Sequence, residues 1–134
     1  MIDLLHAIPL RRSLLADAAL TSATGLLLAL GAAPLSGLLG LPQPLLFWAG
    51  VSLLPFAGVV ALLARRERAP RTAVRAVVLY NALWALDSVL LLALGWVHPT
   101  ALGSAFVLAQ ALAVAGFALA QYAGLQQRHG AATA

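Results

Sequence analysis

Asp87 is the residue of this sequence whose surroundings most strongly indicate chemistry, because it lies within a long apolar stretch, 76–97. In a helix, Asp87 would lie about 18 Å along the axis from Arg75. No basic residue is expected at that depth, so the carboxyl group should be mostly neutral and donate a hydrogen bond. A carboxylate that binds and releases a proton there would suit a proton-coupled carrier or a cation site. The alternative is a plain hydrogen bond between helices.

The same helix is expected to have one polar and aromatic face. At 100° per residue, Tyr80, Asn81, Trp84, Asp87 and Ser88 fall within an arc of roughly 120°. Lipid cannot satisfy such a face, so it should point at other helices or at a cavity. Trp84 and Tyr80 could form a wall for a flat or cationic ligand. Packing for Trp84 and an interfacial position for Tyr80 are the plainer alternatives, and packing is favoured for Trp84.

Three other apolar stretches carry a polar residue at a similar depth. Thr24, Ser52 and Gln110 each lie about 18–19 Å from one end of their stretch. Gln110, Ser52 or the Val51 carbonyl, which a proline four residues later leaves free, could accept a hydrogen bond from Asp87. We therefore predict a polar layer near the bilayer midplane and a site for a ligand or a proton. The candidate site residues are Asp87, Gln110, Asn81, Trp84, Ser88, Thr24 and Ser52.

The elements that hold these residues follow from composition. The chain has 134 residues, of which 63% are hydrophobic and only 9% are charged. Soluble domains are about 25% charged, so lipid is the expected solvent. A spanning helix needs about 20 apolar residues. Four stretches of the chain have this length and composition. We therefore predict one all-α domain, 13–122, which forms an integral membrane four-helix bundle made of two hairpins. Its expected spans are 13–33, 45–64, 76–97 and 100–122.

The basic residues predict the orientation of the spans. All eight are arginines, and they precede the first span, separate the second from the third, and follow the fourth. By the positive-inside rule these segments are cytoplasmic, which places both termini inside a bacterial-type inner membrane. The arginines are Arg11, Arg12, Arg65, Arg66, Arg68, Arg71, Arg75 and Arg128.

The flanking segments are short. Residues 1–12 are expected to lie on the cytoplasmic interface, and residues 123–134 to form a disordered cytoplasmic tail. The apolar loop 35–41 is expected to lie flat on the outer surface. Asp17, about 7 Å past Arg12, is interpreted as reaching the cytoplasmic interface or pairing with an arginine rather than serving a site.

A faint internal repeat links the two halves of the chain. Residues 26–31 and 90–95 share the sequence LLLALG, at an offset of 64 residues that also places Asp17 on Asn81 and Thr24 on Ser88. Two hairpins related by an axis along the membrane normal would have this pattern. A chance match between Leu- and Ala-rich helices is the alternative.

The residues that several kinds of catalytic or cofactor site require do not occur in suitable positions in this sequence. There is no cysteine, and His6, His98 and His129 all lie outside the expected spans, so we expect no metal, haem or other cofactor. No nucleophile with a plausible base is present, which argues against an enzyme. Clustered arginines beside apolar segments indicate orientation, not nucleic-acid binding. Two function classes remain: a small carrier or sensor, which would need to form a homodimer, and an accessory subunit of a larger membrane complex.

Overall fold

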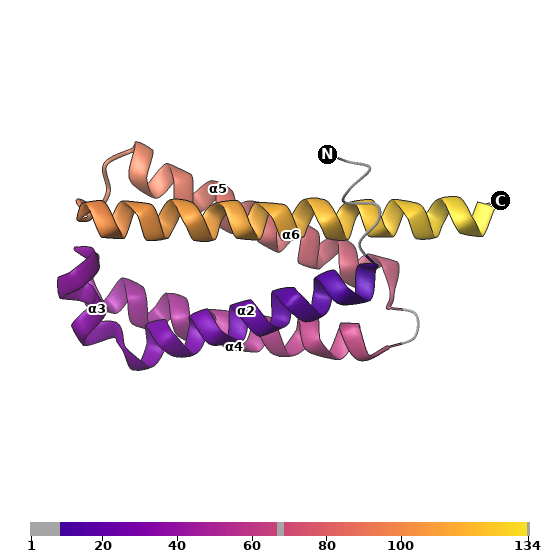
Figure 1. Ribbon diagram of the computed structural model, residues 1–134, viewed down its shortest axis with the longest axis horizontal. Coiled ribbons are helices and arrows are strands. Elements are labelled where there is room, and N and C mark those ends of the chain that lie inside the picture. Colours follow the sequence, from indigo (N-terminus) through magenta and orange to yellow (C-terminus); the bar gives the residue numbers. More distant parts are fainter. Residues whose placement is uncertain (1–8, 67–68, 134) are drawn as a thin grey trace.

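The computed structural model describes residues 9–66 and 69–133, and this part of the chain contains helices and no strands (Figure 1). Four of its helices are long and apolar enough to cross a membrane: α2, α4, α5 and the segment Ala101–Gln126 of α6. The all-helical fold and the four apolar segments predicted from the sequence are thereby confirmed. The helices are α2 (Leu10–Leu30), α3 (Ala32–Leu39), α4 (Gln43–Arg65), α5 (Arg71–Ala93) and α6 (Ala101–Thr133).

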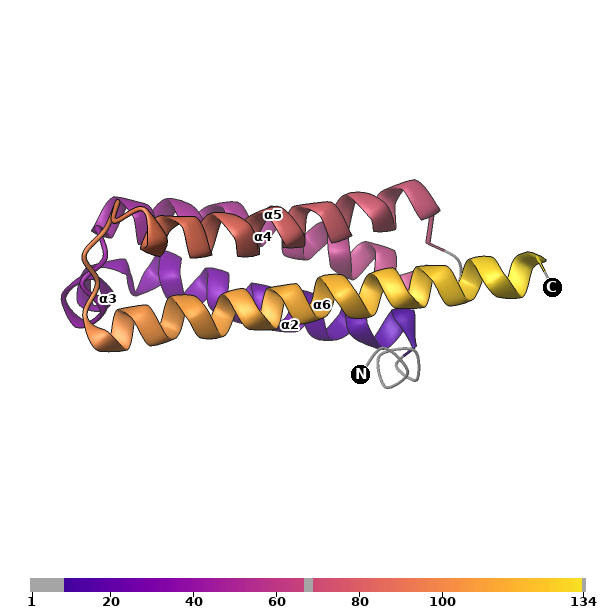
Figure 2. The same cartoon turned by 90° about the horizontal axis from the view of Figure 1, so that it is seen from above.

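The four long helices lie side by side as two pairs. α2 packs along α4 and α5 packs along α6, and these two contacts are the most extensive in the described chain. Between the pairs, α6 contacts α2, whereas α4 and α5 barely touch (Figures 1 and 2). We call the end of the bundle that holds Arg11, Arg65 and Arg71 the arginine end, and the opposite end, where α3 lies, the α3 end.

Two glycines allow α2 and α4 to approach closely. A Cβ atom added to Gly50 would lie 2.6 Å from the Ala29 nitrogen and from the Gly25 carbonyl oxygen. A Cβ on Gly25 would lie 3.0 Å from the Gly50 carbonyl oxygen. Small residues at helix crossings have this role in membrane proteins, where backbones must pack without a hydrophobic driving force between helices.

Apolar side chains fill the bundle at both ends. Near the arginine end, Leu14, Val60, Val74 and Leu125 belong to one buried cluster, so all four long helices contribute to it. Near the α3 end, a second cluster is built mainly on α2, α3 and α4. The outer surface is apolar as well: Leu62 is 63% exposed and Leu112 74% exposed. Such an exposed surface suits contact with lipid.

The helix ends differ from the predicted spans. α5 begins at Arg71, five residues before the predicted 76, because Pro70 sets the extended backbone that precedes its first turn. It ends at Ala93 rather than 97, where the chain turns through Gly95 at a φ of 68°. The predicted loop 35–41 contains most of α3, whose Pro34 lies in the first turn, where a missing amide donor costs little.

The last helix is longer than predicted. Residues 123–133 continue α6 as a helix, whereas the sequence predicted a disordered tail. Ala123 and Leu125 are buried, and Gly124 packs against Leu10 at the start of α2. The additional turns therefore cover apolar surface at the arginine end. The predicted interfacial segment 1–12 lies mostly outside the described residues, and Leu10 is already helical.

Candidate functional site

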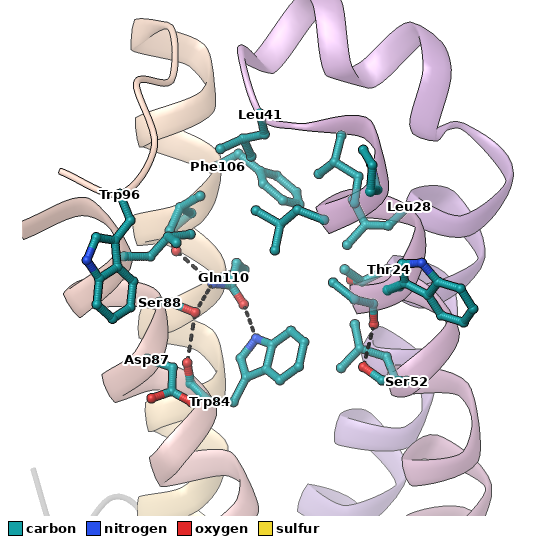
Figure 3. A pocket seen from close by; sticks show the side chains of 18 residues that line it. Thr24, Leu28, Leu41, Ser52, Trp84, Asp87, Ser88, Trp96, Phe106 and Gln110 are labelled. Carbon is teal, nitrogen blue, oxygen red and sulfur yellow. Dashed lines mark hydrogen bonds between the residues drawn. The ribbon is translucent and has the colours of Figure 1, made fainter. Parts of the chain in front are cut away.

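A cavity of about 780 Å³ lies between the two helix pairs, toward the α3 end. Most of its wall is apolar. Figure 3 shows the α5 and α6 side chains facing those of α2 and α4 across it. Its lining includes Thr24, Ser52, Trp84, Asp87, Ser88 and Gln110. Six of the seven residues predicted for the site thus surround one cavity, and Asn81 lies elsewhere.

The side of the cavity between α4 and α5 is loosely packed. These helices barely contact each other, and Ser52 of α4 and Asp87 of α5, which both line the cavity, are exposed. Toward the arginine end the gap is closed by Phe56 of α4, which stacks on Tyr80 of α5 with ring centroids 4.0 Å apart. Tyr80 in turn lies beside Trp84, at 6.1 Å between centroids.

Trp84, Gln110 and Ser88 form a hydrogen-bonded chain on one wall. The Trp84 indole donates to the Gln110 amide oxygen at 2.9 Å, and the Gln110 amide nitrogen donates to the Ser88 hydroxyl at 2.9 Å. Ser88 donates to the Trp84 carbonyl at 2.8 Å. The Gln110 amide also donates to the Val107 carbonyl at 2.9 Å. These bonds fix the orientation of the indole, whose body projects into the space between the helix pairs (Figure 3).

Asp87 differs in two ways from its prediction. The expected hydrogen bond to Gln110, Ser52 or the Val51 carbonyl is absent, because the Gln110 oxygen already accepts from Trp84. Within the described chain, the carboxylate has no hydrogen-bond partner and is exposed at the cavity margin. Because α5 ends at Ala93, Asp87 lies only about 9 Å from that end of the helix, nearer the α3 end than the predicted midplane.

The opposite wall is less polar. Ser52 donates to the carbonyl of Ala49 within α4, at 2.9 Å, and Thr24 is half-buried on α2. Trp48 and Trp96 are 65% and 68% exposed and also line the cavity toward the α3 end. All three tryptophans of the chain therefore border this one cavity.

A second polar cluster lies toward the arginine end, fully buried between three helices. Its centre is Asp17, whose side chain is 0% exposed. One carboxylate oxygen accepts from the Thr21 hydroxyl at 2.8 Å, and the other accepts from the Asn81 and Gln121 amides, each at 2.8 Å. Asn81 also donates to the Gln121 oxygen at 3.1 Å. The cluster joins α2, α5 and α6.

This cluster corrects the interpretation of Asp17. The residue neither reaches the interface nor pairs with an arginine, because amide donors from α5 and α6 lie at its level in the bundle. Asn81, predicted for the ligand site, serves this cluster instead. Gln121 was missed because it lies next to the predicted end of the fourth span, where a polar residue is expected to be solvated. The sequence did contain one signal for this cluster: the internal repeat, with its offset of 64 residues, aligns Asp17 with Asn81.

Comparison with known proteins gives no relative: no family model matches the chain, and neither a curated protein nor a solved structure matches it. The class of protein is therefore defined by the fold and the cavity alone. In the part of the chain that the structure describes, four helical segments are able to span a membrane and a cavity lies between them.

Proposed function

We propose that this protein binds a small, mostly apolar ligand in the cavity between its two helix pairs, and that the ligand reaches the cavity from the bilayer. One observation carries the proposal: a cavity of about 780 Å³ whose wall combines apolar side chains with a few oriented polar groups. Sites for small organic ligands typically have about 300–1,000 Å³ and this kind of lining. The protein would act by binding or carrying its ligand, not by catalysis.

The proposed setting is a bacterial-type inner membrane, with the arginine end in the cytoplasm. The positive-inside rule supports this orientation, because no arginine lies in the connections at the α3 end. In that orientation both hairpins return to the cytoplasm, and the cavity lies toward the outer leaflet. The gap between α4 and α5 would then give access to ligands dissolved in that leaflet.

Tryptophan fluorescence offers a direct test, since every tryptophan of the chain lines the cavity. We would titrate the neutral lipophilic fluorophore N-phenyl-1-naphthylamine into the protein in lipid nanodiscs and follow energy transfer from tryptophan. Binding in the cavity gives saturable transfer. Partition into the bilayer gives only a linear background, which empty nanodiscs measure.

A matched pair of variants locates the binding. Ala49→Phe fills part of the cavity, because Ala49 lies on its wall. Ala82→Phe adds the same side chain at an exposed position on α5 away from the cavity. The proposal expects saturable transfer to be lost in the first variant and kept in the second. Equal saturable transfer in both variants, or none in the native protein, would overturn it.

A further inference from the structure

We propose that the cavity selects lipophilic organic cations, with Asp87 as the counter-charge for the cationic group. This inference rests on the proposed ligand-binding function and specifies the chemical class of the ligand. The position of Asp87 motivates it. The carboxylate lies at the cavity margin, exposed, and no hydrogen bond within the described chain uses its oxygens.

Charge complementarity favours a cation. Asp87 is the one ionisable acid among the described residues that line the cavity, and none of those lining residues is Arg, Lys or His. An anionic headgroup would therefore meet a like charge with nothing to offset it. A neutral ligand would leave the negative charge of the Asp87 carboxylate unpaired.

The membrane environment strengthens this choice. A carboxylate within a spanning helix is costly unless it is paired, protonated or solvated. The Asp17 carboxylate is stabilised by three hydrogen bonds from neighbouring side chains. The Asp87 carboxylate accepts no hydrogen bond in the described chain. A bound cation would neutralise Asp87 and remove much of that cost. The same charge pair would thus select the cation and stabilise the Asp87 carboxylate.

The rest of the cavity suits the apolar part of such a molecule. Trp84 is held in place by its bond to Gln110, so its ring is a fixed surface on the wall. Trp48 and Phe106 add further aromatic surface to the lining. Aromatic faces attract organic cations through the ring quadrupole, most strongly where water is excluded. Aromatic walls and one carboxylate at the margin together form a site for a bulky cation with apolar substituents.

Two ions of nearly the same shape and opposite charge test the proposal: tetraphenylphosphonium and tetraphenylborate. Each would be titrated against protein already loaded with N-phenyl-1-naphthylamine, in nanodiscs of zwitterionic phosphatidylcholine. The membrane concentration of each ion is corrected with empty nanodiscs. We expect the cation to displace the fluorophore at a concentration lower by about tenfold or more than the anion, as one close charge pair would give.

Variants of Asp87 then assign the selectivity. Asp87→Asn should lose about tenfold in displacement by the cation, with displacement by the anion unchanged or improved. Asp87→Glu, which keeps the charge, should retain the preference. Saturable fluorophore binding is measured first in each variant, and displacement by each ion is expressed relative to it.

The outcomes separate the two proposals. Equal displacement by both ions in the native protein, or a cation preference that survives in Asp87→Asn, overturns cation selectivity while fluorophore binding still supports the cavity. Loss of saturable fluorophore binding in the native protein overturns the ligand-binding function itself, and the selectivity with it.

Discussion

The side-chain amide of Asn81 donates a hydrogen bond of 2.8 Å to the carboxylate of Asp17, and the two residues are 64 positions apart. This separation is the offset of the internal repeat seen in the sequence. In two hairpins related by an axis along the membrane normal, equivalent residues that face the axis contact each other. Thr24 and Ser88, the next equivalent polar pair, line the same cavity. These two pairings favour a parallel repeat over a chance match.

The two halves nevertheless pack unequally. In a symmetric arrangement the contact of α2 with α6 would equal that of α5 with α4, yet the first is clearly the more extensive. The Asp17 cluster helps to explain the difference, because Gln121 of α6 bonds to Asp17 of α2. Between α4 and α5, Phe56 stacks on Tyr80 toward the arginine end, and Ser52 donates to the Ala49 carbonyl within its own helix. The contact between α4 and α5 is therefore the looser of the two contacts between the helix pairs.

Removing the Asp17 carboxylate should destabilise the bundle. In Asp17→Leu the Asn81 and Gln121 amides lose an acceptor in a fully buried position. An unsatisfied buried polar group costs about 1–3 kcal/mol, so we expect a loss in that range in the free energy of unfolding. SDS titration in mixed micelles, followed by tryptophan emission, measures it.

Asp87→Leu is the matched control for that experiment. It makes the same exchange on another spanning helix, at an exposed residue with no hydrogen bond in the described chain. Its free energy of unfolding should be unchanged or higher. If both variants lose the same stability, the Asp17 cluster has no special structural role.

Close packing of α2 against α4 gives a second prediction. Gly50→Ala places a Cβ atom 2.6 Å from backbone atoms of Ala29 and Gly25, so the two helices must separate. Overpacking of this kind costs about 1–3 kcal/mol, measurable by the same SDS titration. Gly58→Ala, on the same helix with open space around it, should instead gain up to about 1 kcal/mol from helix propensity. Equal effects at the two glycines would show that this crossing tolerates separation.

How much of this structure the sequence could predict depends on the kind of signal. The four apolar segments follow from hydropathy, because lipid imposes the same requirement on every residue of a span. The grouping of Thr24, Ser52 and Gln110 around one cavity followed from depth, since polar residues at one level on packed helices tend to face each other. Depth does not predict how each helix is rotated about its own axis. In the structure the rotation of α5 places Asp87 at the margin of the cavity.

Asp17 and Gln121 show what depth cannot predict. From the sequence both residues lie near helix ends, where water or an arginine would satisfy them. In the structure α6 continues past Tyr122, so Gln121 lies inside the bundle and reaches Asp17. The extension depends on Leu125 and Ala123 finding apolar partners at the arginine end. Such a tertiary contact is not encoded in local composition.

Arg11 should stabilise the end of α4. Its Nε donates to the Ala64 carbonyl at 2.8 Å, and its second guanidinium nitrogen approaches the Arg65 carbonyl at 3.3 Å. A cation at a helix C-terminus contributes about 0.3–1 kcal/mol, so Arg11→Gln should lose that amount and speed hydrogen exchange in the last turn of α4. Arg12→Gln removes the same charge from an exposed neighbour that makes no such bond in the described chain. Equal exchange rates in the two variants would count against capping by Arg11.

The proposed orientation can be tested with single cysteines, because the native chain has none. Gly37 lies in α3 with open space around it, and Thr72 is exposed in the first turn of α5 at the arginine end. With the arginine end in the cytoplasm, a membrane-impermeant maleimide should label Gly37→Cys in intact spheroplasts. Thr72→Cys should react only after the membrane is permeabilised, because its side chain would face the cytoplasm. Labelling of both variants in intact cells would contradict four spans, and the reverse pattern would invert the orientation and place the cavity toward the inner leaflet.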